Sequence, residues 1–453
     1  MKSLSLLLVV ILFSCSAKAQ FGMPSYKEVA RAFFSSYTHT DKTSYISFYR
    51  KKSGWYICKK RYDNSDSIFA QDIFWSASAR TYIPINFIPA KPGPAEIEKR
   101  TKEYFDLHYN EFDEYPFQRN QYFGYKGWQW DIIQDAKSFE NKNDTILESY
   151  ARAFSDYAMG YIHQYDKTPF LNNDADRKNL APTDRLGKSR KEKFIRYLQK
   201  GIDAYTVLAR QNPHYETRVG NINIKLANEY MLLYSELLMD KDPDRGLPFA
   251  GKAIYTDSLL RICKNYLDAV PPGGILITGH DNDTYPVWYL QDIEKYRQDV
   301  LVVNYNMLYV KRYLLHLKDR SVQPLFSIPD TALLRTDFLA FYYSNSGSAN
   351  QEIQLEDFLK NLANKTNPYE EKSFSWRHAG GYTYYTQKVY FQKDSKAVKI
   401  YFPLSSLTFL NEYMLLDILL TNQNRPVYST TLLPIIENVL DLTDKGIYRV
   451  VLW

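Results

Sequence analysis

The spacing of hydrophobic residues divides this chain into three regions. Between residues 20 and 135, short runs of alternating apolar and polar residues predict strands over 45–49, 54–62, 67–75 and 81–87. A helix over 26–37 precedes them. Aromatic rings are dense between Tyr104 and Trp130, which indicates the packing of a small domain more than a binding face. We expect a mixed α+β, aromatic-rich N-terminal domain over residues 20–135.

Helical spacing dominates residues 144–268. Apolar residues recur every three or four positions in three stretches, around 194–208, 222–237 and 259–267. Small residues within the first two stretches resemble tetratricopeptide-like hairpins, although the roughly 34-residue repeat of such hairpins is not clean. An ordinary helical subdomain explains the pattern equally well. Repeated hairpins would predict a spacer or a surface for a protein partner.

Strands and helices alternate from residue 270 to the end. A run over Ile275–Ile277, a polar turn, a helical segment and a second run over Val300–Val303 form a crossover, the unit of a parallel sheet. Further helices are predicted over 307–317, 334–343, 353–362 and 407–420, and further strands over 383–391, 397–402, 426–429 and 448–453. The prediction is an α/β C-terminal domain over 270–453, with a Rossmann-like crossover and a partly parallel sheet.

An acidic and polar turn follows the first strand of the crossover. Ligands of parallel sheets usually lie at the carboxyl ends of the strands, where this turn falls. Carboxylates and amides that can bind hydroxyl groups, next to aromatic rings, are what sugar binding requires. We therefore predict a ligand-binding set: His280, Asp281, Asn282, Asp283, Thr284, Tyr285 and Trp288.

Several other roles of this turn stay open. Asp283 or Thr284 could simply cap the following helix, with Pro286 in its first turn. The oxygen atoms of the turn could hold Ca²⁺ or Mg²⁺, but the residue spacing of a calcium-binding loop is absent, so the sequence does not decide whether the turn binds a metal ion. His280 could act as an acid–base group. Nucleotide binding is disfavoured, because carboxylates that would repel a phosphate occupy the position of a glycine-rich phosphate-binding loop. We predict neither a cofactor nor a catalytic residue.

The N-terminus has the pattern of a secretory signal peptide over residues 1–19. Lys2 precedes an apolar block over 4–13, and Ala17-Lys18-Ala19 supplies the small-residue cleavage site. This predicts an extracytoplasmic location, in the periplasm or cell envelope. The alternative is a lipoprotein signal, with Cys15 acylated after cleavage. No other apolar stretch approaches the ~20 residues of a membrane helix, so a lipid on Cys15 would be the expected attachment to a membrane.

Charge and cysteine content add two limits. The formal net charge of +6 is a weak field for this length, and the basic run Lys188–Lys193 is interrupted by Glu192, so nucleic acid is not an expected partner. Beyond the signal, Cys58 and Cys263 remain. We expect two buried thiols, with a disulfide as the alternative.

Three stretches resemble a known family. Residues 279–291, with Arg297-Gln298-Asp299-Val300 and Val302-Val303-Asn304, are similar to a segment near the carboxyl end of certain multi-pass bacterial membrane proteins. These are grouped with protein O-mannosyltransferase-like (GT-C type) glycosyltransferases and are otherwise called a domain of unknown function. Residues 413–419 with 425–428, and residues 446–451, are also similar, so the resemblance covers roughly residues 270–453.

The resemblance implies an extracytoplasmic module associated with glycosylation. The transferase chemistry of that family is attributed to its membrane-embedded half, which this sequence lacks, so the resemblance transfers no catalytic residue. We predict a non-catalytic module that binds a glycan or a protein partner. The alternatives are a transferase or hydrolase that acts on glycans or glycoproteins through Asp281 and Asp283, and an envelope scaffold that uses residues 144–268 to bind its partner.

Overall fold

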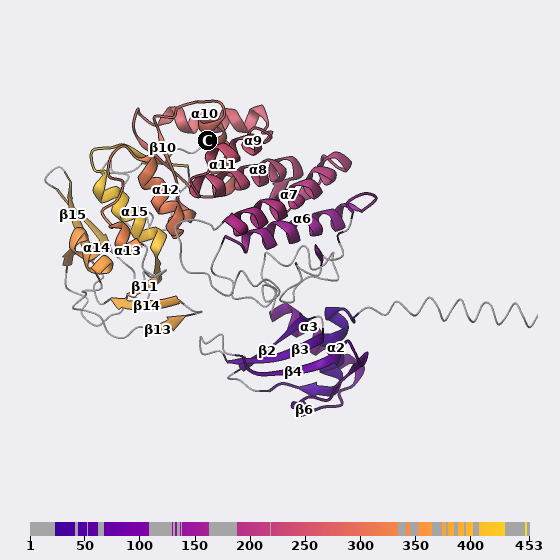
Figure 1. Ribbon diagram of the computed structural model, residues 1–453. Helices are drawn as coiled ribbons and strands as arrows, with labels where there is room; N and C mark the ends of the chain where they lie inside the picture. Colours follow the sequence, from indigo (N-terminus) through magenta and orange to yellow (C-terminus); the bar gives the residue numbers. More distant parts are fainter. Residues whose placement is uncertain are drawn as a thin grey trace, which may run out of the picture. The chain divides into compact units, whose positions relative to one another are not determined.

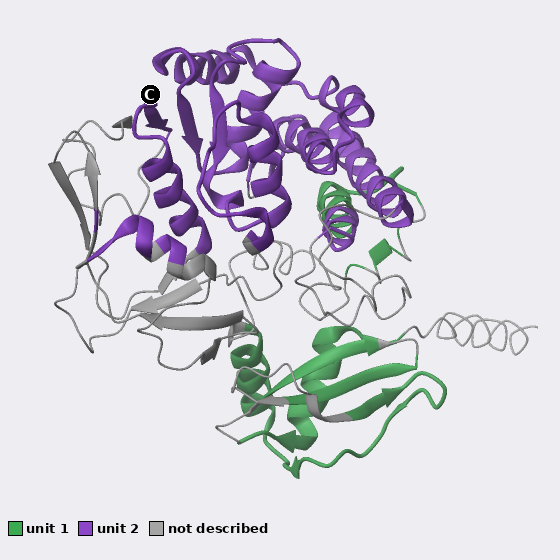
Figure 2. Ribbon diagram, turned by 60° about the vertical axis from the view of Figure 1, so that its left-hand side comes forward, with its two compact units in different colours: residues 1–153, 167–175 green, residues 154–166, 176–453 purple. Residues whose placement is uncertain are grey.

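The computed structural model describes residues 23–40, 44–51, 53–61, 68–107, 129, 132–133, 136, 138–162, 188–217, 219–333, 341–344, 352–364, 374–376, 379–384, 388–393, 396–401, 407–430 and 449–450. The chain forms two compact units, one from residues 1–153 and 167–175 and the other from 154–166 and 176–453 (Figure 2). The division into three domains stays a prediction, and the predicted signal peptide lies outside the described residues. None of the described helices combines the length and apolar character needed to cross a membrane.

The first unit packs helices against an antiparallel sheet (Figure 1). The sheet has the order β2-β3-β4-β5, with bounds Ser44–Lys51, Gly54–Arg61, Ile68–Ser76 and Thr81–Tyr82. Helix α2 (Tyr26–Ser36) precedes the sheet in sequence. Strand β1 (Tyr37–Thr38), before the sheet, pairs with β6 (Ile88–Pro89), after it. The predicted helix and first three strands are confirmed. Helix α3 (Pro94–Leu107) was not predicted, and Pro94 begins it, a position that tolerates proline.

Aromatic rings form the core of this unit. Tyr26 of α2 stacks on Trp55 of β3, with ring centroids 5.9 Å apart, and its hydroxyl lies 2.9 Å from that of Tyr104 in α3. Phe33 and Phe48 also meet edge to face within the same core. Of the stretch between Tyr104 and Trp130, Tyr104 and Phe105 are buried in this core, whereas residues 108–128 lie outside the described residues, so that packing by their rings stays a prediction.

Helices lead into the second unit. Their bounds are α6 (Asp144–Met159), α7 (Lys188–Gln211), α8 (Ile222–Met239), α9 (Pro243–Ala250) and α10 (Asp257–Ala269). A small hairpin of β7 (Glu216–Thr217) and β8 (Gly220–Asn221) joins α7 to α8. The three predicted helical stretches are confirmed, whereas α9, which Pro243 opens, was not predicted. The tetratricopeptide resemblance stays a prediction.

The predicted parallel sheet is present in the second unit. Its order is β10-β9-β18-β19, with bounds Leu301–Asn304, Ile275–Thr278, Val427–Ser429 and Arg449–Val450, and every neighbouring pair is parallel. Helix α11 (Asp281–Asp292) carries the chain from β9 to β10. The later strand β18 pairs with the other side of β9, so the strand order reverses at β9. The α/β prediction is confirmed at this level, and its Rossmann-like detail stays a prediction.

Smaller elements complete the second unit. They are η3 (Tyr305–Met307), α12 (Lys311–Arg320), α13 (Asp330–Leu333), β11 (Phe341–Ser344), β12 (Glu352–Gln354), α14 (Leu355–Asn364), β13 (Phe374–Trp376), β14 (Ala379–Tyr384), β15 (Lys388–Lys393), β16 (Lys396–Tyr401), β17 (Leu407–Phe409) and α15 (Leu410–Thr421). Two further sheets have the orders β13-β14-β11-β17 and β12-β15-β16. The helix predicted over 334–343 is wrong at its end, because residues 341–344 pair as a strand with β14 and β17.

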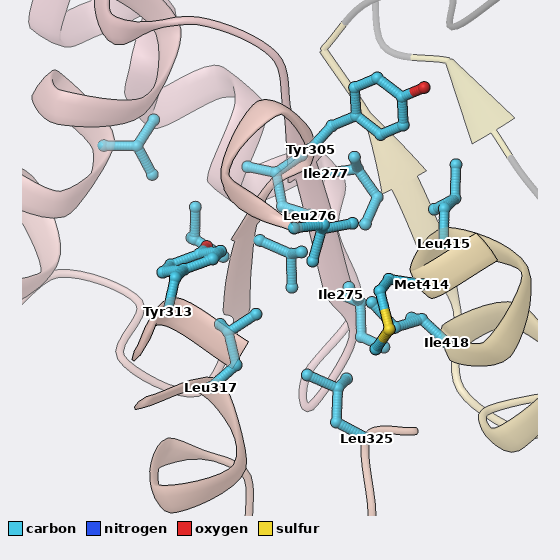
Figure 3. Close-up of a cluster of buried hydrophobic side chains, with 14 of the residues drawn as sticks. Ile275, Leu276, Ile277, Tyr305, Tyr313, Leu317, Leu325, Met414, Leu415 and Ile418 are labelled. Carbon is cyan, nitrogen blue, oxygen red and sulfur yellow. The ribbon is translucent and has the colours of Figure 1, made fainter. Parts of the chain in front are cut away.

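The parallel sheet lies in an apolar core. Every residue of β9 is buried, and Figure 3 shows its side chains between Tyr313 and Leu317 of α12 and Met414 and Ile418 of α15. A strand that is buried on both faces reads as a continuous apolar run, which is why the sequence located it. One carboxylate lies inside this core: Asp417 of α15 accepts hydrogen bonds from the backbone N–H groups of Ser327 and Ile328.

Candidate functional site

The predicted turn lies at the carboxyl end of β9, where the strand order reverses. Gly279 and His280 leave the strand, and α11 begins at Asp281. Residue Thr430 directly follows β18, the neighbour of β9 in the sheet. In open α/β sheets this position is where ligands usually bind. The structure therefore places the predicted residues at the edge of the sheet where ligands of such folds usually bind. The contacts of each residue decide what it can do there.

Asp283 is occupied by internal hydrogen bonds. Its Oδ1 accepts from the backbone N–H of His280 at 2.6 Å, and its Oδ2 accepts from the N–H of Gly279 at 2.9 Å. The Thr430 hydroxyl donates to the same Oδ2 at 2.6 Å. The carboxylate thus caps the start of α11 and ties it to β18. The capping alternative is the role that the contacts give to this residue.

Thr284 belongs to a buried polar cluster beneath the turn. Its hydroxyl lies 2.7 Å from that of Thr278 and accepts a hydrogen bond of 2.8 Å from the Asn304 side chain. Asn304 in turn accepts from the N–H of Met307 through its Oδ1. These bonds join β9, α11 and β10, and Thr284 has no exposed surface for a ligand.

The two predicted rings are buried, which corrects the expectation of an aromatic platform. Tyr285 is 5% exposed and Trp288 is 4% exposed. Their rings contact each other, and Trp288 also contacts Tyr313 of α12. Helix α11 lies between neighbouring helices and the sheet, so residues 284–288 are buried all round the helix. Ring spacing in the sequence could not reveal this two-sided cover.

Asn282 fixes neighbouring segments around the turn. Its Nδ2 donates to the backbone carbonyl of Val219, next to β8, at 3.2 Å. Its Oδ1 accepts a hydrogen bond of 2.7 Å from Asn228 of α8. The Oδ1 of Asn228 accepts from the Tyr255 hydroxyl at 2.9 Å. Asn282 therefore supports the edge of the sheet while remaining partly accessible at the surface.

Asp281 is the member of the set whose exposed side chain forms no hydrogen bond or ion pair with the described residues, and His280, also exposed, precedes it at the cap of α11. The surrounding protein desolvates the Asp281 carboxyl and raises its pKa. Glu229 also raises this pKa, whereas Lys225 lowers it. The charge of Lys225 favours the ionised form of Asp281, and the desolvation outweighs it.

A polar cluster on α8 lies next to Asp281 and was not predicted. Glu229 is 2% exposed and accepts a hydrogen bond of 2.8 Å from Ser155 of α6. Lys225, one helical turn earlier, lies 2.5 Å from the same carboxylate. The sequence signal was available, since a lysine and a glutamate four residues apart interrupt an otherwise apolar helix. Its burial against other helices required the tertiary structure.

This arrangement supports binding better than acid–base chemistry. Glycoside hydrolysis uses two carboxylates that face each other across the substrate. In this turn, Asp283 commits both oxygens to the protein and only Asp281 faces solvent. Across the described residues, no group of histidine, cysteine and acidic side chains is arranged to hold a metal ion.

Comparisons with known proteins place part of this region in context. A family model described as TMEM260-associated domain 2 matches residues 260–400, less than half of the chain. The match begins in α10 and includes the turn, β9, α11 and β10. Searches of curated proteins and of solved structures found no significant match. The matched residues overlap the stretch whose sequence resembles the protein O-mannosyltransferase-like family.

Proposed function

We propose that this protein is a non-catalytic binding module of a glycosylation-linked process. The observation that carries the proposal is the TMEM260-associated match over the segment that presents the exposed Asp281 at the carboxyl end of β9. An unpaired carboxylate at this edge can accept hydrogen bonds from hydroxyl or ammonium groups of a glycan or a protein partner. His280 offers a second polar contact beside it.

The energetics of Asp281 favour a role in binding over a role in stability. Its neighbour Asp283 supplies the cap that α11 needs, so Asp281 is not required for that purpose. Desolvation by the protein raises the pKa of Asp281, which means that folding slightly disfavours its charge. A carboxylate whose ionised form is disfavoured by the folded protein, at the edge of a sheet where ligands usually bind, is typical of functional sites.

A saccharide and peptide array tests the proposal. The purified full chain would be applied to mannose-containing oligosaccharides, O-mannosylated peptides and the same peptides without sugar. We expect retention that Asp281→Asn reduces by about tenfold and Asp244→Asn, an exposed acid in α9, leaves unchanged. The array members should keep their mass. A mass change that depends on Asp281 would establish the enzymatic alternative instead.

We also propose that the protein is exported, on the strength of the signal-like residues 1–19. The intact mass of the protein recovered from its native host tests this. Cleavage after Ala19 leaves a chain that begins at Gln20, and a diacylated chain that begins at Cys15 would establish the lipoprotein alternative. An unprocessed chain would contradict both.

A further inference from the structure

Two exposed aliphatic side chains lie in segments that hydrogen bonds join to the turn at the carboxyl end of β9. Ile254, in the loop between α9 and α10, is 80% exposed, and Val219, next to β8, is 39% exposed. A single exposed aliphatic residue is ordinary on a protein surface. These two differ because hydrogen bonds tie both of their segments to the turn that carries Asp281.

The ties form one continuous chain of hydrogen bonds. It runs from Tyr255, next to Ile254, to Asn228 at 2.9 Å, from Asn228 to Asn282 at 2.7 Å, and from Asn282 to the carbonyl of Val219 at 3.2 Å. Asn228 and Tyr255 are 5% and 6% exposed. Buried polar chains of this kind, when their members are bonded, hold a single arrangement. The segments around Tyr255, Asn282 and Val219, which are far apart in sequence, are thereby joined through Asn228 and Asn282.

The charge at this edge is complementary to a cation. Within the described part of the chain, Asp281 accepts no hydrogen bond and forms no ion pair. Lys225, whose charge lowers the pKa of Asp281, forms its ion pair with Glu229 at 2.5 Å. We call the group formed by Val219, Ile254, His280, Asp281 and Asn282 the carboxyl-edge surface.

We propose that the carboxyl-edge surface binds a polypeptide segment that presents a lysine or arginine next to aliphatic residues. The inference rests on the proposed function, because it names the class of partner for the same edge. A carbohydrate is the less suitable occupant, since the rings of Tyr285 and Trp288 that would stack on a sugar are buried. Aliphatic side chains and a carboxylate match a peptide with apolar and cationic groups better.

Synthetic peptides of defined composition test this inference. The array would hold 12-residue peptides with one central lysine or arginine among leucine and valine, together with copies in which glutamate replaces the basic residue. The full chain should retain the basic peptides about tenfold better than the acidic copies. Asp281→Asn and Ile254→Ser should each weaken retention by about fivefold or more.

A matched control distinguishes binding at this surface from nonspecific binding to exposed apolar residues. Val322 is also a fully exposed aliphatic residue, far from these segments in sequence, so Val322→Ser should leave retention unchanged. Circular dichroism of each variant should match that of the parent protein, because all the substituted side chains are exposed.

The outcomes distinguish this inference from the proposed function. One outcome would overturn the polypeptide inference and leave the proposed function intact. In that outcome, retention of mannose-containing oligosaccharides depends on Asp281, and the Ile254→Ser variant retains the peptides as well as the parent protein does. Peptide retention that neither substitution changes would also overturn the inference. If no array member depends on Asp281, both the inference and the proposed function fail.

Discussion

Two aspartates one residue apart in the same turn have different physical roles. Asp283 accepts hydrogen bonds from two backbone N–H groups and from Thr430, whereas Asp281 has exposed oxygens and no bonded partner among the described residues. The sequence predicted both a cap and a binding group here, and could not assign the two roles. The assignment follows from their positions in α11, because Asp283 is the third residue, whose carboxylate reaches back to the backbone before the helix, and Asp281 is the first.

Alanine substitutions at these two positions should therefore differ in their effect on stability. Asp283→Ala leaves two N–H groups at the start of α11 and one hydroxyl without their acceptor, so we expect a loss of about 1–3 kcal/mol in the free energy of unfolding. Asp281→Ala should change it by less than about 0.5 kcal/mol. Urea unfolding of both variants measures this, and equal losses would contradict the assignment.

The pKa of Asp281 gives a prediction about pH. Desolvation raises this pKa above the roughly 3.9 of an unfolded chain, so the folded state binds the proton more tightly than the unfolded state. Wild-type stability therefore falls as the pH rises through this interval. Asp281→Asn cannot ionise, and it should gain stability relative to wild type between about pH 3 and about pH 7, with little difference at the acidic end. Urea midpoints across this range test the sign, and a relative loss at neutral pH would refute it.

At the scale of elements, one arginine joins the helix and loops that surround β9. Arg297 donates hydrogen bonds of 2.8 Å to the carbonyls of Leu267 and Val270 at the end of α10, and it pairs with Asp299. Gln291 of α11 donates to the carbonyls of Arg297 and Val300 on the same loop. The residues that carried the family resemblance at 297–300 thus have a structural role in placing β10 beside β9.

Removing this arginine should loosen the crossover. Arg297→Ala leaves two helix-end carbonyls without their charged donor, and we expect a loss of about 1.5–3 kcal/mol in the free energy of unfolding. Arg261→Ala, an exposed arginine earlier on α10, is the matched control and should be nearly neutral. Thermal unfolding compares the two, and similar midpoints would show that the loop does not depend on Arg297.

At the scale of the whole molecule, the two remaining cysteines are buried in different units. Cys58 lies in β3 of the first unit and Cys263 lies in α10 of the second. Burial raises the pKa of the Cys263 thiol to about 12, which keeps it protonated and unreactive at neutral pH. The expectation of two buried thiols agrees with their burial.

Thiol labelling tests this at the level of the intact protein. The native protein should react slowly with a maleimide, because neither sulfur is accessible. After unfolding in guanidinium without a reductant, both cysteines should react, and peptide mapping should find the label at Cys58 and Cys263. An absence of label at both positions would indicate a disulfide and contradict the buried-thiol prediction.

The sequence by itself determined the elements whose signal is local. Continuous apolar runs located β9 and β10, and periodic spacing located α7, α8 and α10, since a buried strand or helix face must be apolar wherever it lies in the fold. It failed where partners far along the chain decide the structure. Residues 341–344 became a strand because β14 and β17 lie beside them, and Pro243 could either end or begin a helix.

Only the tertiary structure decided the character of the candidate site. The sequence placed seven polar and aromatic residues at one turn, and it could not tell which of them would face inward. Thr430, Asn228 and Asn304 arrive from distant segments and bond Asp283, Asn282 and Thr284, while neighbouring helices cover Tyr285 and Trp288. Hydrogen bonding and burial depend on what lies across the fold, so the exposure of Asp281 could be read only from the tertiary structure.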